Sequence, residues 1–230
     1  MKTRSMFLAV ILSAAVILSG CTGMKSSTKG GLIGGASGAA VGAGIGALAG
    51  GGKGAAIGAA IGTAVGGTAG VVIGKKMDQQ KAELEKIEGA KVETVTDANN
   101  LKAIKVTFES GILFSTGKSE LNAQSKNALT KFAESLKNTP ETDITVVGHT
   151  DNTGTREFNE KLSVDRANSV VNFLSQNGVK KDRTTIKGLA WDEPVGDNST
   201  AEGRAQNRRV EVFITANETM IKQAEEGTLK

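Results

Sequence analysis

The 230-residue chain has one cysteine, one histidine and no tyrosine. A single cysteine makes a disulfide within the chain impossible. A zinc site needs at least three protein ligands, and here it would rely almost entirely on carboxylates, which suit zinc poorly. Aromatic residues make up only 3% of the chain and the net charge is only +4, whereas nucleic-acid binding needs clustered basic residues and stacking aromatics. We therefore expect no metal, no cofactor and no nucleic acid partner.

The first residues have the layout of a secretory signal peptide. Lys2 and Arg4 precede an uncharged run over residues 5–20, whose apolar middle is too short to span a bilayer comfortably. The run ends in "LSGC", which resembles the lipobox of bacterial lipoproteins, where the cysteine is acylated and becomes the first residue. The resemblance implies a signal peptide at 1–20, lipidation of Cys21 and a lipidated tether at 21–29. An ordinary signal peptide ending near an idle cysteine is the alternative.

Residues 30–74 contain glycine at every fourth position without interruption, with mostly Ala, Ile, Val and Leu between. Small residues four apart lie along one ridge of a helix and let another backbone approach closely, whereas a flexible linker has polar residues and no such register. The segment resembles the glycine zipper of bacterial envelope proteins. Because Lys53 interrupts it at "GGGKG", we predict a helical hairpin over 30–76 with its turn at 50–54.

The sequence does not decide whether this hairpin lies in a membrane or packs against protein. Each half is about as long as a helix that crosses a hydrocarbon core, roughly 20 residues. However, glycine costs about 1 kcal/mol relative to alanine in an exposed helix, so an isolated hairpin in water should be unstable. It needs lipid, packing against copies of itself as a homo-oligomer, or packing against another part of the chain.

A charged stretch separates the zipper from a folded domain. We interpret residues 77–90 as a charged linker or stalk whose role is spacing. Residues 91–216 are long enough to form one core, and we interpret 217–230 as a C-terminal tail.

Inside the domain, strand patterns alternate with helix patterns. We predict strands at 91–95, 101–108, 143–149, 183–190 and 208–215. Asn122 can cap a helix that ends before Pro140, a second helix runs from near Thr155 to about Asn177, and residues 199–202 fit a capping box. This order predicts an α+β fold with helices packed on one face of a mixed β-sheet.

Four motifs of this domain together resemble the OmpA-like peptidoglycan-binding domain. They are "GHTDNTG" at 148–154, "NEKLSVDRANSVVNFL" at 159–174, "GV" at 178–179 and "GRAQNRRVEV" at 203–212. With the lipobox and the zipper, they give the order found in small outer-membrane lipoproteins of the OmpA family. In that family an aspartate of the "TD" motif and an arginine of the "LSxxRA" helix bind diaminopimelate of the peptidoglycan stem peptide. The matching residues are Asp151 and Arg166.

The chemistry of Asp151 and Arg166 suits this task. Diaminopimelate ends in an ammonium beside a carboxylate, so its binder needs a fixed anion and a fixed planar cation close together. On the predicted helix Asn159, Ser163 and Arg166 form one polar stripe that can turn toward Asp151. The alternative is that Asp151 and Arg166 simply pair with each other.

The resemblance also implies three further ligand-site residues, Thr150, Asn159 and Arg208. Arg208 matches an arginine that can reach a ligand carboxylate, although it can instead form a structural bridge to an acidic loop. Ser115 departs from the family, because many members have an acidic residue there.

An enzyme is the competing interpretation, since His149, Asp151 and Ser163 together have the residue types of a hydrolytic site. The chain has no GxSxG motif, so we expect a binding protein and a histidine packed at a strand end with one nitrogen bonded to backbone.

Taken with the family resemblance, the sequence predicts a lipoprotein anchored in the outer membrane through acylated Cys21. Its binding domain would face the periplasm and tether the membrane to peptidoglycan. Alternatively, the zipper carries the function by inserting or oligomerising, and wall binding is only positional.

Overall fold

The computed structural model describes residues 67–97, 99–115 and 117–229. The predicted signal peptide, Cys21 and the hairpin turn at 50–54 lie outside the described residues. Within these three ranges, no helix is both long and apolar enough to cross a membrane.

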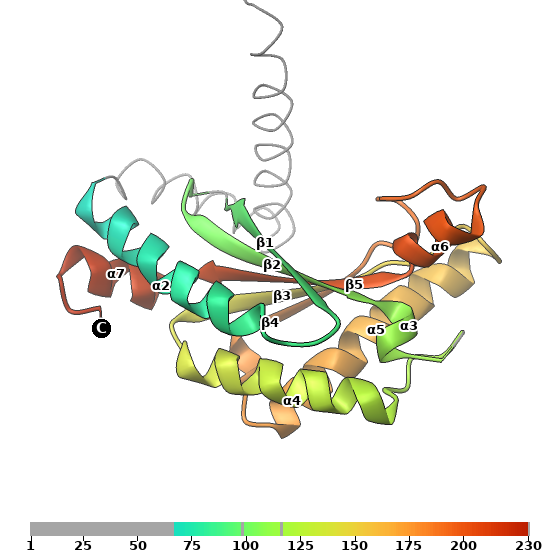
Figure 1. Cartoon of the computed structure of the whole chain (residues 1–230), viewed down its shortest axis with the longest axis horizontal. Helices are drawn as coiled ribbons and strands as arrows, with labels where there is room; N and C mark the ends of the chain where they lie inside the picture. The colour runs from blue at the N-terminus through green and yellow to red at the C-terminus, as the bar shows by residue number, and fades with distance from the viewer. Residues whose placement is uncertain (1–66, 98, 116, 230) are drawn as a thin grey trace, which may run out of the picture. The chain divides into compact units, whose positions relative to one another are not determined.

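Five strands and several helices make up the described chain (Figure 1). The strands are β1 (Ala90–Thr96), β2 (Lys102–Glu109), β3 (Thr142–Gly148), β4 (Thr184–Gly188) and β5 (Arg209–Ala216). The helices are α2 (Thr68–Leu84), α3 (Ser110–Leu113), α4 (Ala123–Asn138), α5 (Arg156–Gln176), the short η2 (Lys181–Arg183), α6 (Ala201–Asn207) and α7 (Glu218–Glu225). All five predicted strands are present, within a few residues of their expected bounds.

The strands form one mixed sheet in the order β1-β2-β5-β3-β4. The first three pairings are antiparallel, and β3 pairs in parallel with β4 across the α5 crossover. In the register of this sheet, Val212 lies opposite both Val106 and Val146. Directly opposed residues point to the same face, so these valines begin the core.

One face of the sheet carries the helices. Its strand residues form a single apolar cluster with residues of α2, α4, α5 and α7, among them Ile73, Phe132, Val170 and Met220, all fully buried. The other face has a much smaller apolar cluster around Val147 and Phe213. The predicted α+β fold, with helices packed on a mixed sheet, is confirmed.

Helix α2 corrects the predicted linker at 77–90. Instead of spacing two parts of the chain, α2 runs without a break across residue 76 and packs on β1, β2 and α7. Ile73, Met77 and Leu84 are at most 1% exposed, and the Gln80 amide donates a hydrogen bond of 2.6 Å to Thr139 Oγ1. The last residues of the predicted zipper and the first part of the predicted linker therefore belong to the folded domain.

The predicted C-terminal tail also proves to be part of this domain. Residues 218–225 form α7, whose start is capped by the Asn217 side chain, and Met220 and Ile221 are buried against α2 and the sheet. The sequence did not indicate this helix, because its short apolar stripe stands among charged residues and packs on α2, which is distant in sequence.

The helix starts follow local capping chemistry. Asn122 accepts a hydrogen bond from the backbone N–H of Ser125, so its predicted N-cap is confirmed. Thr155, near which the second helix was expected to begin, caps α5 by accepting from the backbone N–H of Phe158. The predicted capping box at 199–202 is displaced by one residue, because Thr200 caps α6 by accepting from Gly203 N.

Candidate functional site

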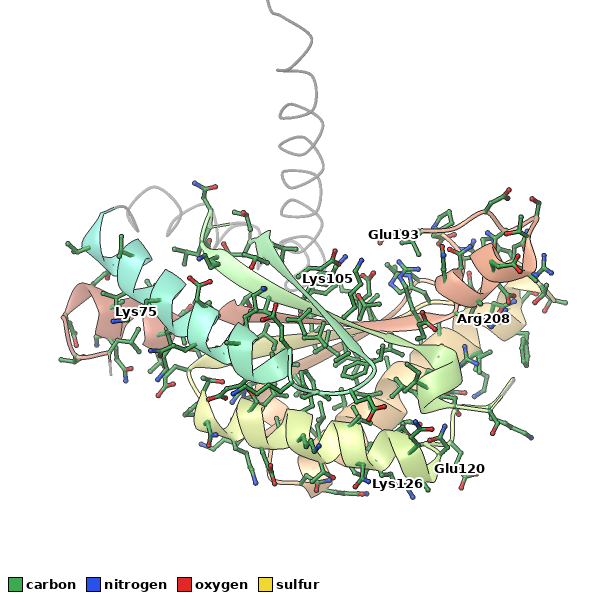
Figure 2. All side chains as sticks on the ribbon, viewed as in Figure 1. Lys75, Lys105, Glu120, Lys126, Glu193 and Arg208 are labelled. Carbon is green, nitrogen blue, oxygen red and sulfur yellow. The ribbon has the colours of Figure 1, made fainter. Side chains whose placement is uncertain are left out.

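The predicted site residues gather at one end of the sheet. There β3 ends, β5 begins at Arg209, the chain leaves β2 into α3, and α5 begins. Figure 2 shows Arg208 at this end, close to α3 and the first turns of α5. His149 N–H donates to the Arg209 carbonyl at 2.9 Å and Ser110 N–H to the Arg208 carbonyl at 2.8 Å. These backbone bonds hold the three strand ends together.

Asp151 is a buried carboxylate with partners on both oxygens. Oδ1 accepts from the backbone N–H of Thr153 at 3.0 Å and from its hydroxyl, and Oδ2 accepts from Nη1 of Arg208 at 2.6 Å. Burial alone would raise the pKa of Asp151, but the hydrogen bonds from Thr153 and Arg208 outweigh it and lower the pKa below its usual value. Asp151 is therefore a fixed anion at neutral pH.

Arg166 is a buried cation that is short of partners. Its side chain is 2% exposed, with Nε donating to the Lys118 carbonyl at 3.1 Å and the guanidinium 5.4 Å from the centre of the Phe114 ring. Nη1 has no hydrogen-bond partner among the residues that the structure describes. Burial lowers the pKa of Arg166 to about 10, with a contribution from nearby Arg208, so the group stays charged without a bound anion.

Asp151 and Arg166 share a site but do not form the direct pair that the sequence left as an alternative. Asp151 pairs with Arg208, although its charge also acts on Arg166. The Arg208 side chain remains 38% exposed. The site thus has two arginines and one carboxylate, an excess of positive charge that suits an anionic group on a ligand.

Close packing of α5 on the sheet sets the position of Arg166. A Cβ atom on Gly148 would collide with the Ser163 backbone, and one on Gly188 with the Ser163 hydroxyl. The Ser163 hydroxyl donates to the Glu160 carbonyl at 2.8 Å and accepts from Ala190 N–H at 3.2 Å. Glycines at the ends of β3 and β4 therefore let α5 approach the sheet closely.

The other predicted ligand residues divide between the site and its support. Thr150 is buried, its N–H donates to the Ala190 carbonyl at 2.7 Å, and its hydroxyl has no partner in the described residues. The Asn159 amide donates to the carbonyls of Thr153 at 2.7 Å and Thr155 at 3.0 Å. Asn159 thus closes the turn that carries Asp151. Ser115 is exposed in the loop that follows α3.

His149 packs beside an ion pair rather than against Ser163. It is 1% exposed, and Nε2 lies 3.6 Å from Oε2 of Glu211, whose other oxygen accepts from Arg209 at 2.8 Å. Burial alone would raise the pKa of Glu211, but His149 and Arg209 together lower it to about 2. Neither ring nitrogen makes a normal hydrogen bond to the described chain, so the expected backbone bond of His149 is wrong.

The hydrolytic arrangement that the sequence allowed finds no support in this geometry. The Ser163 hydroxyl is fully buried, and a backbone acceptor and a backbone donor both engage it. A nucleophilic serine needs a base within hydrogen-bond reach. His149, the base that the sequence offered, lies beside Glu211 instead.

Sequence reasoning missed three parts of the site. Thr153 could have been found, because an aspartate two residues before a threonine in a turn often accepts its backbone N–H. The Phe114 ring and the Lys118 carbonyl, which hold Arg166, carry no such local signal, since they reach α5 only through the tertiary fold.

Known proteins share both parts of this chain. The OmpA family matches residues 113–208, and the YMGG-like Gly-zipper family matches residues 1–78. The probable lipoprotein YiaD of Escherichia coli K12 is 40% identical over 221 residues, covering 94% of this chain and 99% of that protein. Outer membrane protein Omp38 of Acinetobacter baumannii is 44% identical over 119 residues, covering 51% of this chain. The chain spans only 33% of the length of Omp38.

A solved structure agrees with this relationship. The cell wall anchor of the T6SS from Pseudomonas aeruginosa is 30% identical with a TM-score of 0.52, covering 61% of this chain and 97% of that chain. The near-complete match to YiaD extends over the zipper and the site alike. The chain therefore belongs to the OmpA family, like the probable lipoprotein YiaD, with a glycine-zipper segment before its OmpA domain.

Proposed function

We propose that this chain binds peptidoglycan without changing it, through the zwitterionic end of diaminopimelate, and thereby tethers the outer membrane to the cell wall. The observation that carries the proposal is the buried guanidinium of Arg166, whose Nη1 has no partner in the described chain. The similar solved structure described as a cell wall anchor supports the same class of partner.

The carboxylate of the zwitterion would bind Arg166. A buried hydrogen-bonding group that lacks a partner costs about 1 to 3 kcal/mol, and more when it is charged. A ligand carboxylate that accepts a hydrogen bond from Nη1 of Arg166 would remove this cost. Arg208, half-exposed beside Arg166, adds a second cation. Charge-assisted bonds of guanidinium to carboxylate are also roughly twice as strong as neutral ones.

The ammonium of the zwitterion would bind Asp151. An ionised carboxylate has about four acceptor positions, and Asp151 uses three of them for Thr153 and Arg208. Its lowered pKa keeps it charged throughout the neutral range. A fixed anion beside fixed cations distinguishes a zwitterion from a simple anion such as phosphate.

The proposal predicts direct binding to purified cell wall. Full-length protein in detergent should sediment with sacculi that contain diaminopimelate. It should sediment much less with sacculi whose stem peptides contain lysine, because lysine lacks the second carboxylate that Arg166 would bind. Equal sedimentation with both walls would contradict recognition of the zwitterion.

We also propose that Cys21 carries the lipid anchor, with the domain on the periplasmic side. More than one acyl chain makes membrane attachment stable, since each buried methylene contributes about 0.8 kcal/mol. Cys21→Ser should abolish labelling of the protein with radioactive palmitate and release it from the outer-membrane fraction. Failure of the wild-type protein to take up label would contradict lipidation, and retention of unlabelled Cys21→Ser would show that the zipper itself holds the membrane.

A further inference from the structure

One aromatic side chain stands in solvent next to the proposed binding site. Phe158 is 54% exposed, whereas the other phenylalanines of the described chain are buried or half-buried, as with Phe114 and Phe132. Phe158 lies in the first turn of α5. Its exposure leaves most of the ring without a partner in the described fold.

The Phe158 ring lies beside the turn that carries Asp151. A Cβ atom added to Gly154 would be 3.8 Å from Cδ1 of Phe158. Gly154 has a φ of +90°, a conformation that glycine adopts easily, and Asn159 holds the same turn through the Thr153 carbonyl. The ring therefore borders the site on the side of the anion.

Phe158 also begins a row of side chains that leads to Arg166. Phe158, Leu162 and Arg166 are four residues apart along α5 and therefore lie along one ridge of the helix. Leu162 is half-buried and Arg166 is buried. Two apolar side chains thus lie between the Asp151 turn and the guanidinium, next to the polar stripe of Asn159 and Ser163.

We propose that Phe158 and Leu162 form an apolar shoulder that packs against the alkyl chain adjoining the bound zwitterion. This inference rests on the proposed function, because the zwitterion at Asp151 and Arg166 fixes where the chain begins. In diaminopimelate a short methylene chain joins the zwitterion to the stem peptide. Burial of methylenes against an aromatic ring is favourable, so the shoulder selects a zwitterion with an alkyl chain over a shorter amino acid.

The test compares competitors of increasing chain length. Alanine, norvaline, norleucine and meso-diaminopimelate are each added to full-length protein bound to sacculi, and the concentration that releases half of the protein is measured. For the wild type, each added methylene should lower that concentration, by up to about 4-fold if it is fully buried. Phe158→Ala should flatten this dependence, and Phe158→Leu should retain most of it.

The outcomes separate this inference from the proposed function. If the wild type and Phe158→Ala show the same dependence on chain length, the shoulder does not contact the ligand and the inference fails alone. If meso-diaminopimelate releases no wild-type protein at any concentration, the proposed function fails and the inference with it. Lys161→Ala, on the exposed side of the same helix and paired with Asp165, serves as the matched control.

Discussion

Asp151→Ala and Arg166→Ala should each weaken binding of the full-length protein to sacculi by about 2 to 5 kcal/mol. Loss of Asp151 leaves Arg208 without its partner and adds to the positive excess of the site. Loss of Arg166 removes the buried cation proposed to bind the carboxylate. Both residues are proposed to bind the same zwitterion, so the two losses should not add. The affinity of the double variant should be close to that of whichever single variant binds less tightly.

Two control variants lie on the same helix. Lys161→Ala and Asp165→Ala remove an ion pair that faces solvent on α5, and exposed pairs of this kind contribute about 0 to 1 kcal/mol. Sedimentation with sacculi gives the affinities, and thermal unfolding monitored by circular dichroism shows that each variant is folded. Wild-type binding by folded Asp151→Ala would show that the family role has been assigned to the wrong residue.

Removal of α2 should destabilise the domain severely. A fragment of residues 89–230, which includes the whole domain predicted at 91–216, lacks Ile73, Met77 and Leu84 from the core. Burial of such a side chain contributes about 1.5 to 3 kcal/mol, so their combined loss approaches the total stability of an ordinary domain, about 5 to 15 kcal/mol. We expect this fragment to aggregate or to unfold at much lower urea concentration than a fragment of residues 67–230.

The two fragments differ only in residues 67–88, which makes the comparison specific to α2 and the turn after it. Urea unfolding followed by circular dichroism gives both midpoints. Coinciding midpoints would mean that α2 rests on an independently stable domain, as a linker would.

Local signals in the sequence were sufficient for most of the individual elements. Asn122 caps α4 as predicted, and α5 begins after Thr155 as expected, because capping depends only on residues three positions apart. Helices α2 and α7 were misread for the opposite reason. Their few apolar residues, such as Met77 and Met220, stand among charges and become core only when both helices pack on the same sheet.

The site shows the same division between local and distant information. The fold places Asp151, Arg166, Thr150 and Arg208 at one end of the sheet. The motifs had already indicated this grouping through the family resemblance. The pairing of Asp151 with Arg208 was not predictable, because it depends on β5 beginning beside the end of β3, two segments far apart in sequence. For the same reason, no sequence pattern indicated that Nη1 of Arg166 would have no partner among the residues that the structure describes.

The most direct test of diaminopimelate recognition changes one kind of group on the ligand. Free meso-diaminopimelate and its diamide, in which both carboxylates are neutralised, compete with sacculi for the wild-type protein and for Arg166→Ala. The account predicts that amidation weakens competition strongly for the wild type and scarcely at all for Arg166→Ala, because the lost charge would bind that arginine. Equal competition by the acid and the diamide for the wild type would contradict the account.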